Sequence, residues 1–351
     1  LTENGGAIAA FTTTRVVYTS SNPNSLNFGL NIQLTRDMLR RDAEGNPLRF
    51  GDIYRLTKNT SVGASRNSRK FILLGDPAMR IGLPDELIEI EGINSVSADS
   101  LQNNGTHYTA NALQKVSING SVINRNTDQL QASSNGELEW TVFDASRNIK
   151  YPPEGWVNSG NCYLDDCEYT VRNDILFKGR ASVSNGQFNG EFVVPKDISF
   201  ADRNGRISMY GSIGNNDAVG SFSNVRFNGV DTTAAEDNEG PDMDIYLNDP
   251  GFINGNLVSS APQLNAELED ESGINTTGNG VGHEIIATIE GEETKKKTIV
   301  LNKHYTSELN DYTQGKIEYQ LNDLPEGDHT LTLRAWDVHN NPAEKQIHFT
   351  V

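Results

Sequence analysis

The sequence predicts an α/β segment followed by two all-β sandwich domains. Two apolar runs typical of buried strands, Gly5–Phe11 and Phe71–Leu74, flank a stretch with helical periodicity. Alternating apolar and polar residues with frequent Asn-Gly pairs follow, as in β-structure. The charge also changes: residues 1–86 hold 11 Lys/Arg and 8 Asp/Glu, which leaves 18 of the 29 basic and 39 of the 47 acidic residues for the remainder. We therefore predict three domains, at residues 1–86, 87–236 and 237–351.

The composition argues against several classes of function. A net charge of −18 argues against nucleic acid as a partner and against direct docking on anionic lipid. No apolar stretch approaches the length that spans a membrane. At 351 residues and 36% hydrophobic content, the chain can bury cores of ordinary size without help from disulfides.

The α/β segment is predicted to contain a strand, two helices and a second strand. Both strands are expected to be buried and parallel, joined by a right-handed crossover. The first helix is expected to begin after Asn24 or Ser25 as N-cap and to stop at Gly45-Asn-Pro. Its apolar stripe consists of Leu26, Leu30, Leu34 and Met38.

A shorter helix is predicted over residues 51–59, with Ile53, Tyr54 and Leu56 facing inward. The second strand should end at Gly75-Asp-Pro, because proline cannot continue a central ladder. We expect Asp76 to organise this turn by accepting hydrogen bonds from backbone N–H groups rather than to act in catalysis.

The β region shows no convincing helical pattern, and its spacing favours sandwich domains over one long sheet. Asn-Gly pairs, which favour hairpin turns, begin at Asn104, Asn119, Asn135, Asn185, Asn189, Asn204, Asn228, Asn254 and Asn279. Strands are predicted at 138–143, 180–183, 188–194, 206–210, 284–289 and 330–336. The acidic stretch Thr232–Gly240 is the predicted linker. The segment from Leu324 to Asn341 resembles the last strands of bacterial immunoglobulin-like surface domains, so we expect immunoglobulin-like sandwiches.

Cys162 and Cys167 are the only cysteines. Their short spacing at an expected hairpin end favours a disulfide, which would stabilise the fold by about 2 kcal/mol. A reduced pair is the alternative. No histidine or further cysteine lies nearby to complete a metal site. A disulfide favours an oxidising compartment such as the periplasm or the cell surface.

Two carboxylate clusters are candidates for calcium. The first consists of Asp237, Glu239, Asp242 and Asp244, and the second of Glu267, Glu269, Asp270 and Glu271. Oxygen donors clustered at the pole of a sandwich can bind Ca²⁺ and stiffen a domain junction. We predict Asp237, Asp242 and Asp244 as the ligands, although acidic surface loops alone can explain such clusters on this chain. No cofactor is required.

The sequence does not indicate nucleotide binding, serine-hydrolase catalysis or a metal site at His283. The run Gly278-Asn-Gly-Val-Gly lacks the lysine and the following helix of a phosphate loop, so nucleotide binding is not expected. No Gly-x-Ser-x-Gly elbow occurs, which removes the simplest serine-hydrolase reading. His283 is expected to bond a neighbouring loop rather than a metal.

Several motifs resemble gingipain-type cysteine peptidases. In the first 86 residues they are the Gly-Ala-Ile-Ala strand with its Thr-rich exit, and Phe71-Ile-Leu-Leu-Gly-Asp-Pro-Ala-Met-Arg followed by Leu83-Pro84. The β region resembles the gingipain-like sortases of the type IX secretion system at Leu176-Phe-Lys-Gly-Arg-Ala-Ser, Phe192-Val-Val-Pro-Lys-Asp-Ile and residues 270–283. This resemblance spans essentially the whole chain. It implies that residues 1–86 are the C-terminal part of a caspase-like, gingipain-like catalytic domain.

The resemblance also implies an activity and partners. Such a peptidase is exposed at the cell surface, removes a C-terminal sorting domain from exported proteins and transfers them to an anionic lipopolysaccharide. Its implied partners are those exported proteins, an outer-membrane β-barrel protein and the upstream part of its own catalytic domain.

The catalytic His and Cys of that family are not found in this α/β segment. No histidine precedes His107, and both cysteines lie in the β region. We therefore expect the dyad to lie upstream of Leu1, as though the sequence started partway through the domain, and this chain alone to be inactive.

The resemblance places Tyr18 where gingipains hold an aromatic residue against the first substrate pocket. Thr13 and Arg15 lie on the same strand-exit loop. A packing role for Tyr18 is the alternative. The rival reading of the whole chain is a non-catalytic surface module that binds a protein or glycan through its sandwiches.

Overall fold

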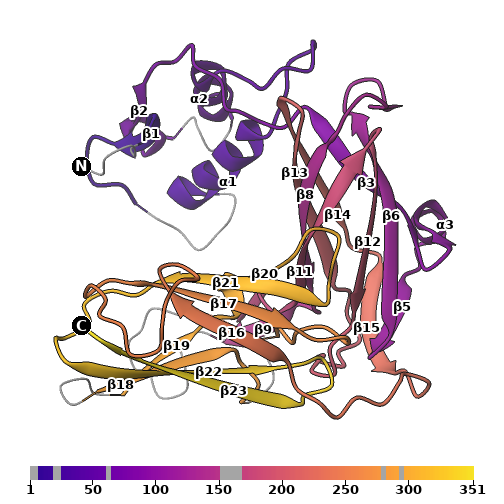
Figure 1. Cartoon of the computed structure of the whole chain (residues 1–351). Coiled ribbons are helices and arrows are strands. Elements are labelled where there is room, and N and C mark those ends of the chain that lie inside the picture. The colour runs from indigo at the N-terminus through magenta and orange to yellow at the C-terminus, as the bar shows by residue number, and fades with distance from the viewer. Residues whose placement is uncertain (1–6, 19–24, 61–64, 151–167, 278–281, 292–295) are drawn as a thin grey trace. The chain divides into compact units, whose positions relative to one another are not determined.

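The structure, a computed structural model, describes residues 7–18, 25–60, 65–150, 168–277, 282–291 and 296–351. The chain divides into two compact units, Leu1–Pro84 and Asp85–Val351 (Figure 1). This division lies beside the change in charge between the basic and acidic parts of the sequence.

The first unit has a two-stranded sheet and two helices. Its elements are β1 (Ala9–Thr13), α1 (Leu26–Met38), α2 (Phe50–Lys58), the 3-10 turn η1 (Ser68–Lys70) and β2 (Phe71–Gly75). Both predicted helices are confirmed, although α1 ends well before Gly45-Asn-Pro.

The pairing of β1 with β2 differs from the prediction. The strands are antiparallel, from Ala9 opposite Gly75 to Thr13 opposite Phe71. The prediction of parallel strands joined by a right-handed crossover was therefore wrong. No residue of either strand is fully buried. The parallel assignment assumed strands that are buried on both faces. The apolar runs of β1 and β2 do not indicate such burial.

A small core joins the helices to the sheet. Leu30, Phe50 and Ile53 are buried, and the ring of Phe11 on β1 meets the ring of Phe50 at 6.2 Å. The hydroxyl of Thr57 on α2 donates to the buried carboxylate of Asp37 on α1 at 2.9 Å. This buried hydrogen bond links α1 to α2.

The second unit begins with a domain that contains one nine-stranded sheet and two two-stranded sheets. Its strands are β3 (Glu86–Ile93), β4 (Val96–Ser97), β5 (Tyr108–Ala112), β6 (Lys115–Asn124), β7 (Gln129–Leu130), β8 (Gly136–Phe143), β9 (Arg147–Lys150), β10 (Glu168–Val171), β11 (Ile175–Ser184), β12 (Gln187–Val193), β13 (Arg206–Ile213), β14 (Asn216–Phe222) and β15 (Val225–Val230). A six-residue helix, α3 (Ala98–Asn103), was not predicted. Ser97 caps it by accepting from the N–H of Ser100.

Seven of these strands close on themselves. The order runs β3-β14-β13-β8-β11-β12-β6, and β6 pairs back with β3. The predicted sandwich is therefore wrong for this domain, whose main sheet is a closed ring filled by side chains. Alternation of apolar and polar residues is the same in both architectures, so the pattern could not separate them.

Aromatic side chains fill the closed sheet. The Trp140 ring lies 4.9 Å from the Phe177 ring and 5.6 Å from the Phe192 ring, and all three are buried. A Cβ atom on Gly190 would lie 2.7 Å from the Trp140 ring. Glycine is therefore needed on β12 so that the indole can lie against the strand.

The last domain is a sandwich of two four-stranded sheets, with strand orders β16-β17-β21-β20 and β19-β18-β22-β23. Its elements are β16 (Asp242–Leu247), β17 (Gln263–Glu269), β18 (Ile286–Gly291), β19 (Lys297–Val300), the 3-10 turn η2 (Asn302–His304), β20 (Tyr305–Ser307), β21 (Gln314–Gln320), β22 (Asp328–Trp336) and β23 (Pro342–Thr350). Side chains of both sheets share one core, in which Leu264, Ile317 and Leu333 are fully buried.

The Asn-Gly pairs serve different purposes. Asn185-Gly186 forms the predicted two-residue hairpin turn between β11 and β12, with positive φ at both residues. Asn119-Gly120 and Asn189-Gly190 instead lie inside strands. A Cβ on Gly120 would overlap the carbonyl of Glu89, so close strand packing explains this glycine.

Candidate functional site

The strand-exit loop after β1 holds the predicted pocket residues. Thr13 is the last residue of β1, Arg15 is exposed, and the Tyr18 side chain is 70% exposed. The side-chain amide of Asn67 bonds the backbone of Tyr18 twice, accepting from its N–H at 2.8 Å and donating to its carbonyl at 2.9 Å. The loop backbone is thus fixed while the ring stays open to solvent.

Lys70, at the end of the 3-10 turn η1, also contacts this loop. Lys70 Nζ donates to the carbonyl of Val16 at 2.7 Å and lies 5.2 Å from the centre of the Tyr18 ring. Asn67 and Lys70 were not singled out from the sequence, because they lie about fifty residues away along the chain. An exposed ring with a neighbouring ammonium can cover the apolar stem of a substrate side chain and favour an acidic neighbour.

Asp76 has the structural role predicted for it. Its Oδ1 accepts the N–H of Ala78 at 2.8 Å, which organises the turn after β2. Residues 1–84 contain neither cysteine nor histidine. This unit therefore holds neither the thiol nor the imidazole of a cysteine-peptidase dyad. The predicted disulfide of Cys162 and Cys167 lies outside the described residues.

A polar cluster forms where the linker meets the sandwich. Among the described residues, Asp237, Asp337 and His339 have ligand atoms within 4.8 Å of one another. Asp242 and Asp244, predicted as ligands with Asp237, do not belong to this group. They lie on β16, where Asp244 pairs with Lys345 at 3.2 Å. The structure thus brings Asp237 to partners about one hundred residues away.

Burial raises the pKa of two carboxyl groups, Asp337 within this cluster and Asp270, which senses the charges of the cluster. Asp270 accepts the N–H groups of Ser272 at 2.9 Å and Gly273 at 3.1 Å. Its burial, together with the charges of Asp337 and Asp237, raises its pKa to about 7. Burial also raises the pKa of Asp337, whose carboxylate accepts from the backbone and side chain of Asn341.

A second network joins the closed sheet to the sandwich. Asp197, in the segment after β12, bonds His283 Nδ1 at 2.7 Å, Asn340 Nδ2 at 2.8 Å and Asn275 Nδ2 at 3.2 Å. The His283 ring packs on Trp336 at 4.4 Å. The prediction that His283 bonds a neighbouring loop is therefore confirmed.

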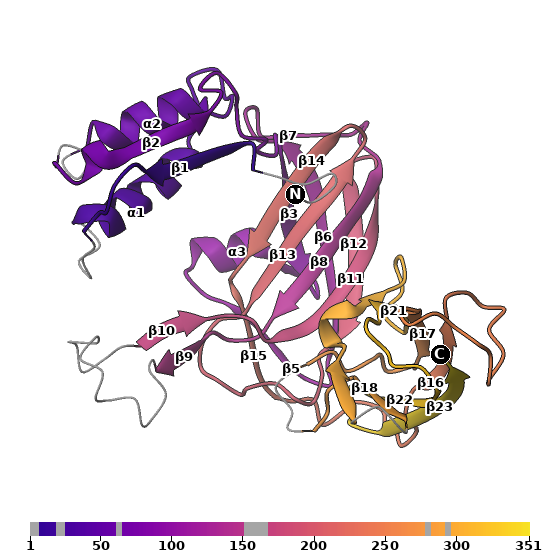
Figure 2. The same ribbon diagram turned by 90° about the vertical axis from the view of Figure 1, so that its left-hand side faces the viewer.

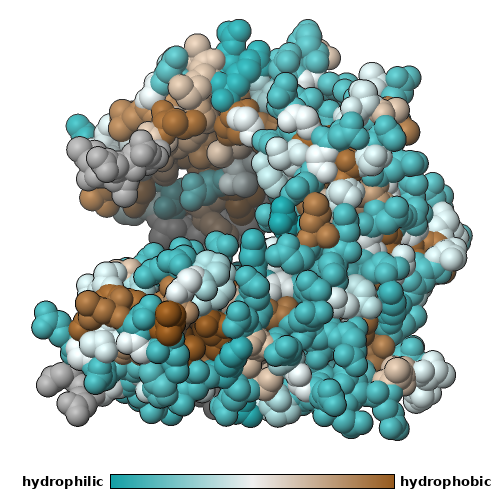
Figure 3. Space-filling view, in the orientation of Figure 1, coloured by the Kyte–Doolittle hydropathy of each residue, from teal (hydrophilic) through white to brown (hydrophobic). Residues whose placement is uncertain are grey.

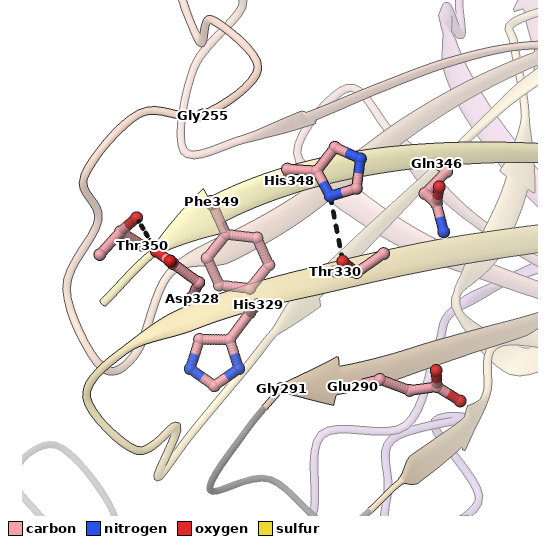
Figure 4. Close-up of a pocket in the computed structure, with 10 residues that line it drawn as sticks. All are labelled: Gly255, Glu290, Gly291, Asp328, His329, Thr330, Gln346, His348, Phe349 and Thr350. Atoms are coloured by element: carbon pink, nitrogen blue, oxygen red, sulfur yellow. Dashed lines mark hydrogen bonds between the residues drawn. The ribbon is translucent and has the colours of Figure 1, made fainter.

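The sandwich has an open cleft at one end of the β18-β22-β23 sheet, with a volume of about 670 Å³ (Figure 4). His348 Nδ1 bonds the Thr330 hydroxyl at 3.0 Å, and the Thr350 hydroxyl donates to Asp328 at 2.6 Å. The His329 ring stacks on Phe349 and its Nε2 bonds the carbonyl of Pro325. His348 remains exposed, so the cleft offers polar hydrogen-bonding groups rather than a metal set.

Comparison with known proteins shows what the first unit resembles. The sequence model of peptidase family C25, the gingipain family, matches residues 1–82. Over this segment the chain is similar to a family of cysteine peptidases. No curated protein matches the chain. Among the described residues, no helix has the length and apolar character needed to cross a membrane.

One of the solved structures compared is similar to this chain in sequence. The chain is 29% identical to dimeric latent PorU from Porphyromonas gingivalis, over 98% of this chain and 31% of that one, with a TM-score of 0.45. It thus spans less than a third of the PorU chain. Red sea bream transglutaminase (9% identity, 75% and 31% coverage, TM-score 0.22) and the fibronectin(III)-like modules of Clostridium thermocellum CbhA (10%, 76% and 94%, 0.18) are too distant to carry an argument.

Proposed function

We propose that this chain is part of a gingipain-like cysteine peptidase that acts as a sortase of the type IX secretion system. The observation that carries the proposal is the match of residues 1–82 to peptidase family C25. The likeness to PorU, which extends through the β domains, supports the sortase class. In this proposal residues 1–84 belong to the catalytic domain, and the β domains brace it.

The chemistry is thiolate attack on a peptide carbonyl, assisted by a histidine. Because residues 1–84 contain neither residue type, the proposal assigns both groups to polypeptide outside this chain. The contribution of this chain is then to substrate binding. Tyr18, with Thr13 and Arg15 beside it, lines the pocket for the residue at the cleavage site.

The surface of the first unit supports packing against further parts of a peptidase domain. Its exposed large apolar residues are Ile8, Val16, Tyr18, Phe28, Leu39, Leu74 and Met79. Figure 3 shows hydrophobic side chains gathered over β1 and β2. An apolar surface gathered over two strands is the kind of surface that marks an interaction site. The proposed occupant is the upstream part of the catalytic domain.

The remaining parts of the proposal concern partners and place. The substrates are exported proteins with a C-terminal sorting domain, which the enzyme cleaves and links to lipopolysaccharide. The site of action is the cell surface, beside an outer-membrane β-barrel partner. Calcium at the acidic pole around Asp237 belongs to the same proposal, and millimolar CaCl₂ should then raise the melting temperature. An unchanged melting temperature would remove it.

Peptide cleavage tests the assignment. The full-length protein that contains this chain should cleave an exported protein at its sorting domain, and iodoacetamide should abolish turnover. This chain alone should show none. In the full-length protein, Tyr18→Ala should raise KM more than it lowers kcat, while Tyr18→Phe keeps the ring and serves as the matched control. Thiol-sensitive turnover by this chain alone would contradict the placement of the dyad. An inactive full-length protein would contradict the peptidase assignment.

The second candidate is a non-catalytic module that binds a glycan or a protein through its sandwich. The open polar cleft of Figure 4 favours it, because hydroxyl, amide and imidazole groups line it without a metal set. Under this reading, His348→Ala abolishes retention of the chain on a glycan array or partner column. The peptidase proposal predicts no such loss.

A further inference from the structure

Arginines gather at one end of the closed sheet. Residues 85–351 contain eight arginines, and five of them lie at this end: Arg147, Arg172, Arg203, Arg206 and Arg226. They come from β9, from the residue after β10, from the segment before β13, from the start of β13 and from β15. Figure 2 shows β9, β10 and β15 at this end of the domain. In a unit with a large excess of acidic residues, such a cluster calls for an explanation.

Asn204 is the centre of the cluster. Its carbonyl accepts from Arg172 Nη2 at 3.1 Å, and its side-chain oxygen accepts from Arg226 Nη2 at 3.4 Å. Arg206 follows two residues later and lies over the Phe143 ring, 5.6 Å from its centre. Two guanidinium groups thus bond Asn204, and a third comes from a residue of the same short segment.

Carboxylates neutralise only part of this charge. Arg147 pairs with Asp174 at 3.3 Å, and Arg226 pairs with the largely exposed Asp202. No carboxylate of the described residues pairs with Arg172, Arg203 or Arg206. Arg203 Nη1 instead bonds the carbonyl of Ser146 and the side chain of Asn148.

Unused donors are buried at the same place. The Nε atoms of Arg172, Arg206 and Arg226 are buried and have no hydrogen-bond partner in the described part of the chain. Burial and the nearby charge of Arg206 lower the pKa of Arg172. Within the described residues the charges of Arg172 and Arg206 have no counter-charge, and an oxyanion bound between the two guanidinium groups would supply one.

We propose that Arg172 and Arg206 bind a phosphate group, with Arg203 and Arg226 at its rim. The planar fork of a guanidinium group matches two phosphate oxygens, and two forks match a doubly charged group better than a carboxylate. Because the whole chain repels anions, binding depends on these local donors and not on net charge. The site consists of residues of the second unit alone and does not rest on the proposed function. Its ligand is either free phosphate or a phosphorylated saccharide.

Binding to this complete chain tests the site. Inorganic phosphate, glucose 6-phosphate and acetate are titrated by calorimetry at constant ionic strength, with sodium chloride as the reference. We expect saturable binding of the two phosphates and none of acetate. Tighter binding of glucose 6-phosphate assigns the site to a phosphorylated saccharide, and equal binding assigns it to the phosphate group alone. No saturable phosphate binding, or equal binding of acetate, would overturn the proposal.

Variants place the binding at the cluster. Arg206→Ala and Arg172→Ala should each weaken phosphate binding about tenfold or more, because each removes one charge-assisted fork. Arg206→Lys keeps the charge but loses the fork, so it should also weaken binding and separates recognition from general attraction. Arg334→Ala, which removes an arginine stacked on Trp336 in the sandwich, is the matched control. Circular dichroism confirms that each variant is folded. Wild-type affinity in folded Arg172→Ala and Arg206→Ala would contradict the site.

Discussion

Asp270 links the stability of the sandwich to pH. Its side chain is 7% exposed, and burial, with the charges of Asp337 and Asp237, raises its pKa from 3.8 to about 7. Between these values the folded chain keeps a proton that the unfolded chain has lost. The free energy of unfolding therefore falls as pH rises through this range, by about 1.4 kcal/mol per pH unit, and levels off above pH 7.

Replacement of Asp270 by Asn should remove most of this dependence. We expect the loss of stability between pH 5 and pH 7 to shrink by roughly 2–3 kcal/mol, and the variant to exceed the wild type in stability at pH 8. Urea unfolding at several pH values measures both effects. Asp242→Asn, at an exposed carboxylate of β16, is the control and should follow the wild type. Parallel pH curves for wild type and Asp270→Asn would refute the raised pKa.

Local chemistry at single residues was predictable, and long-range partners were not. Asp76 and His283 behave as expected, since an Asp before Pro and a His after a glycine-rich loop have common local roles. The approach of Asp237 to Asp337, like the influence of the Arg206 charge on the pKa of Arg172, depends on how strands close in space. No spacing in the sequence reports such contacts.

Elements followed their sequence patterns more closely than their pairings did. Helices α1 and α2 and the main strands lie where periodicity places them. The direction of β1 against β2 and the closure of β3 onto β6 were missed. Periodicity reports which faces of a strand are apolar, whereas strand direction and closure depend on contacts far apart in the chain.

Strand β12 offers a direct test of packing in the closed sheet. A valine at Gly190 would press on the buried Trp140 ring, because even a Cβ there lies 2.7 Å from the indole. Overpacking of this kind costs about 1–3 kcal/mol, and Gly190→Val should lower stability by at least that amount. Asn189→Val puts the same side chain on the exposed face of β12 and is the matched control. Chemical denaturation compares the two, and equal stabilities would show that the indole does not lie against Gly190.

The two compact units should unfold separately, because each has its own core. The core of Leu1–Pro84 is small and leaves large apolar side chains exposed, whereas Asp85–Val351 contains two extended cores. Stability rises with the fraction of surface that a unit buries. We therefore expect calorimetry of the intact chain to show a first transition from residues 1–84 and a later one from residues 85–351.

Substitutions assign the two transitions. Phe50→Ala removes a side chain that is 4% exposed in the small core, and such a change costs about 3–5 kcal/mol. It should lower or abolish the first transition and leave the later one unchanged. Gly190→Val should do the reverse. If a single transition shifted with both substitutions, the units would be one cooperative structure. Residues 1–84 would then need no further polypeptide for their stability, and the main physical support for placing them inside a larger peptidase domain would be lost.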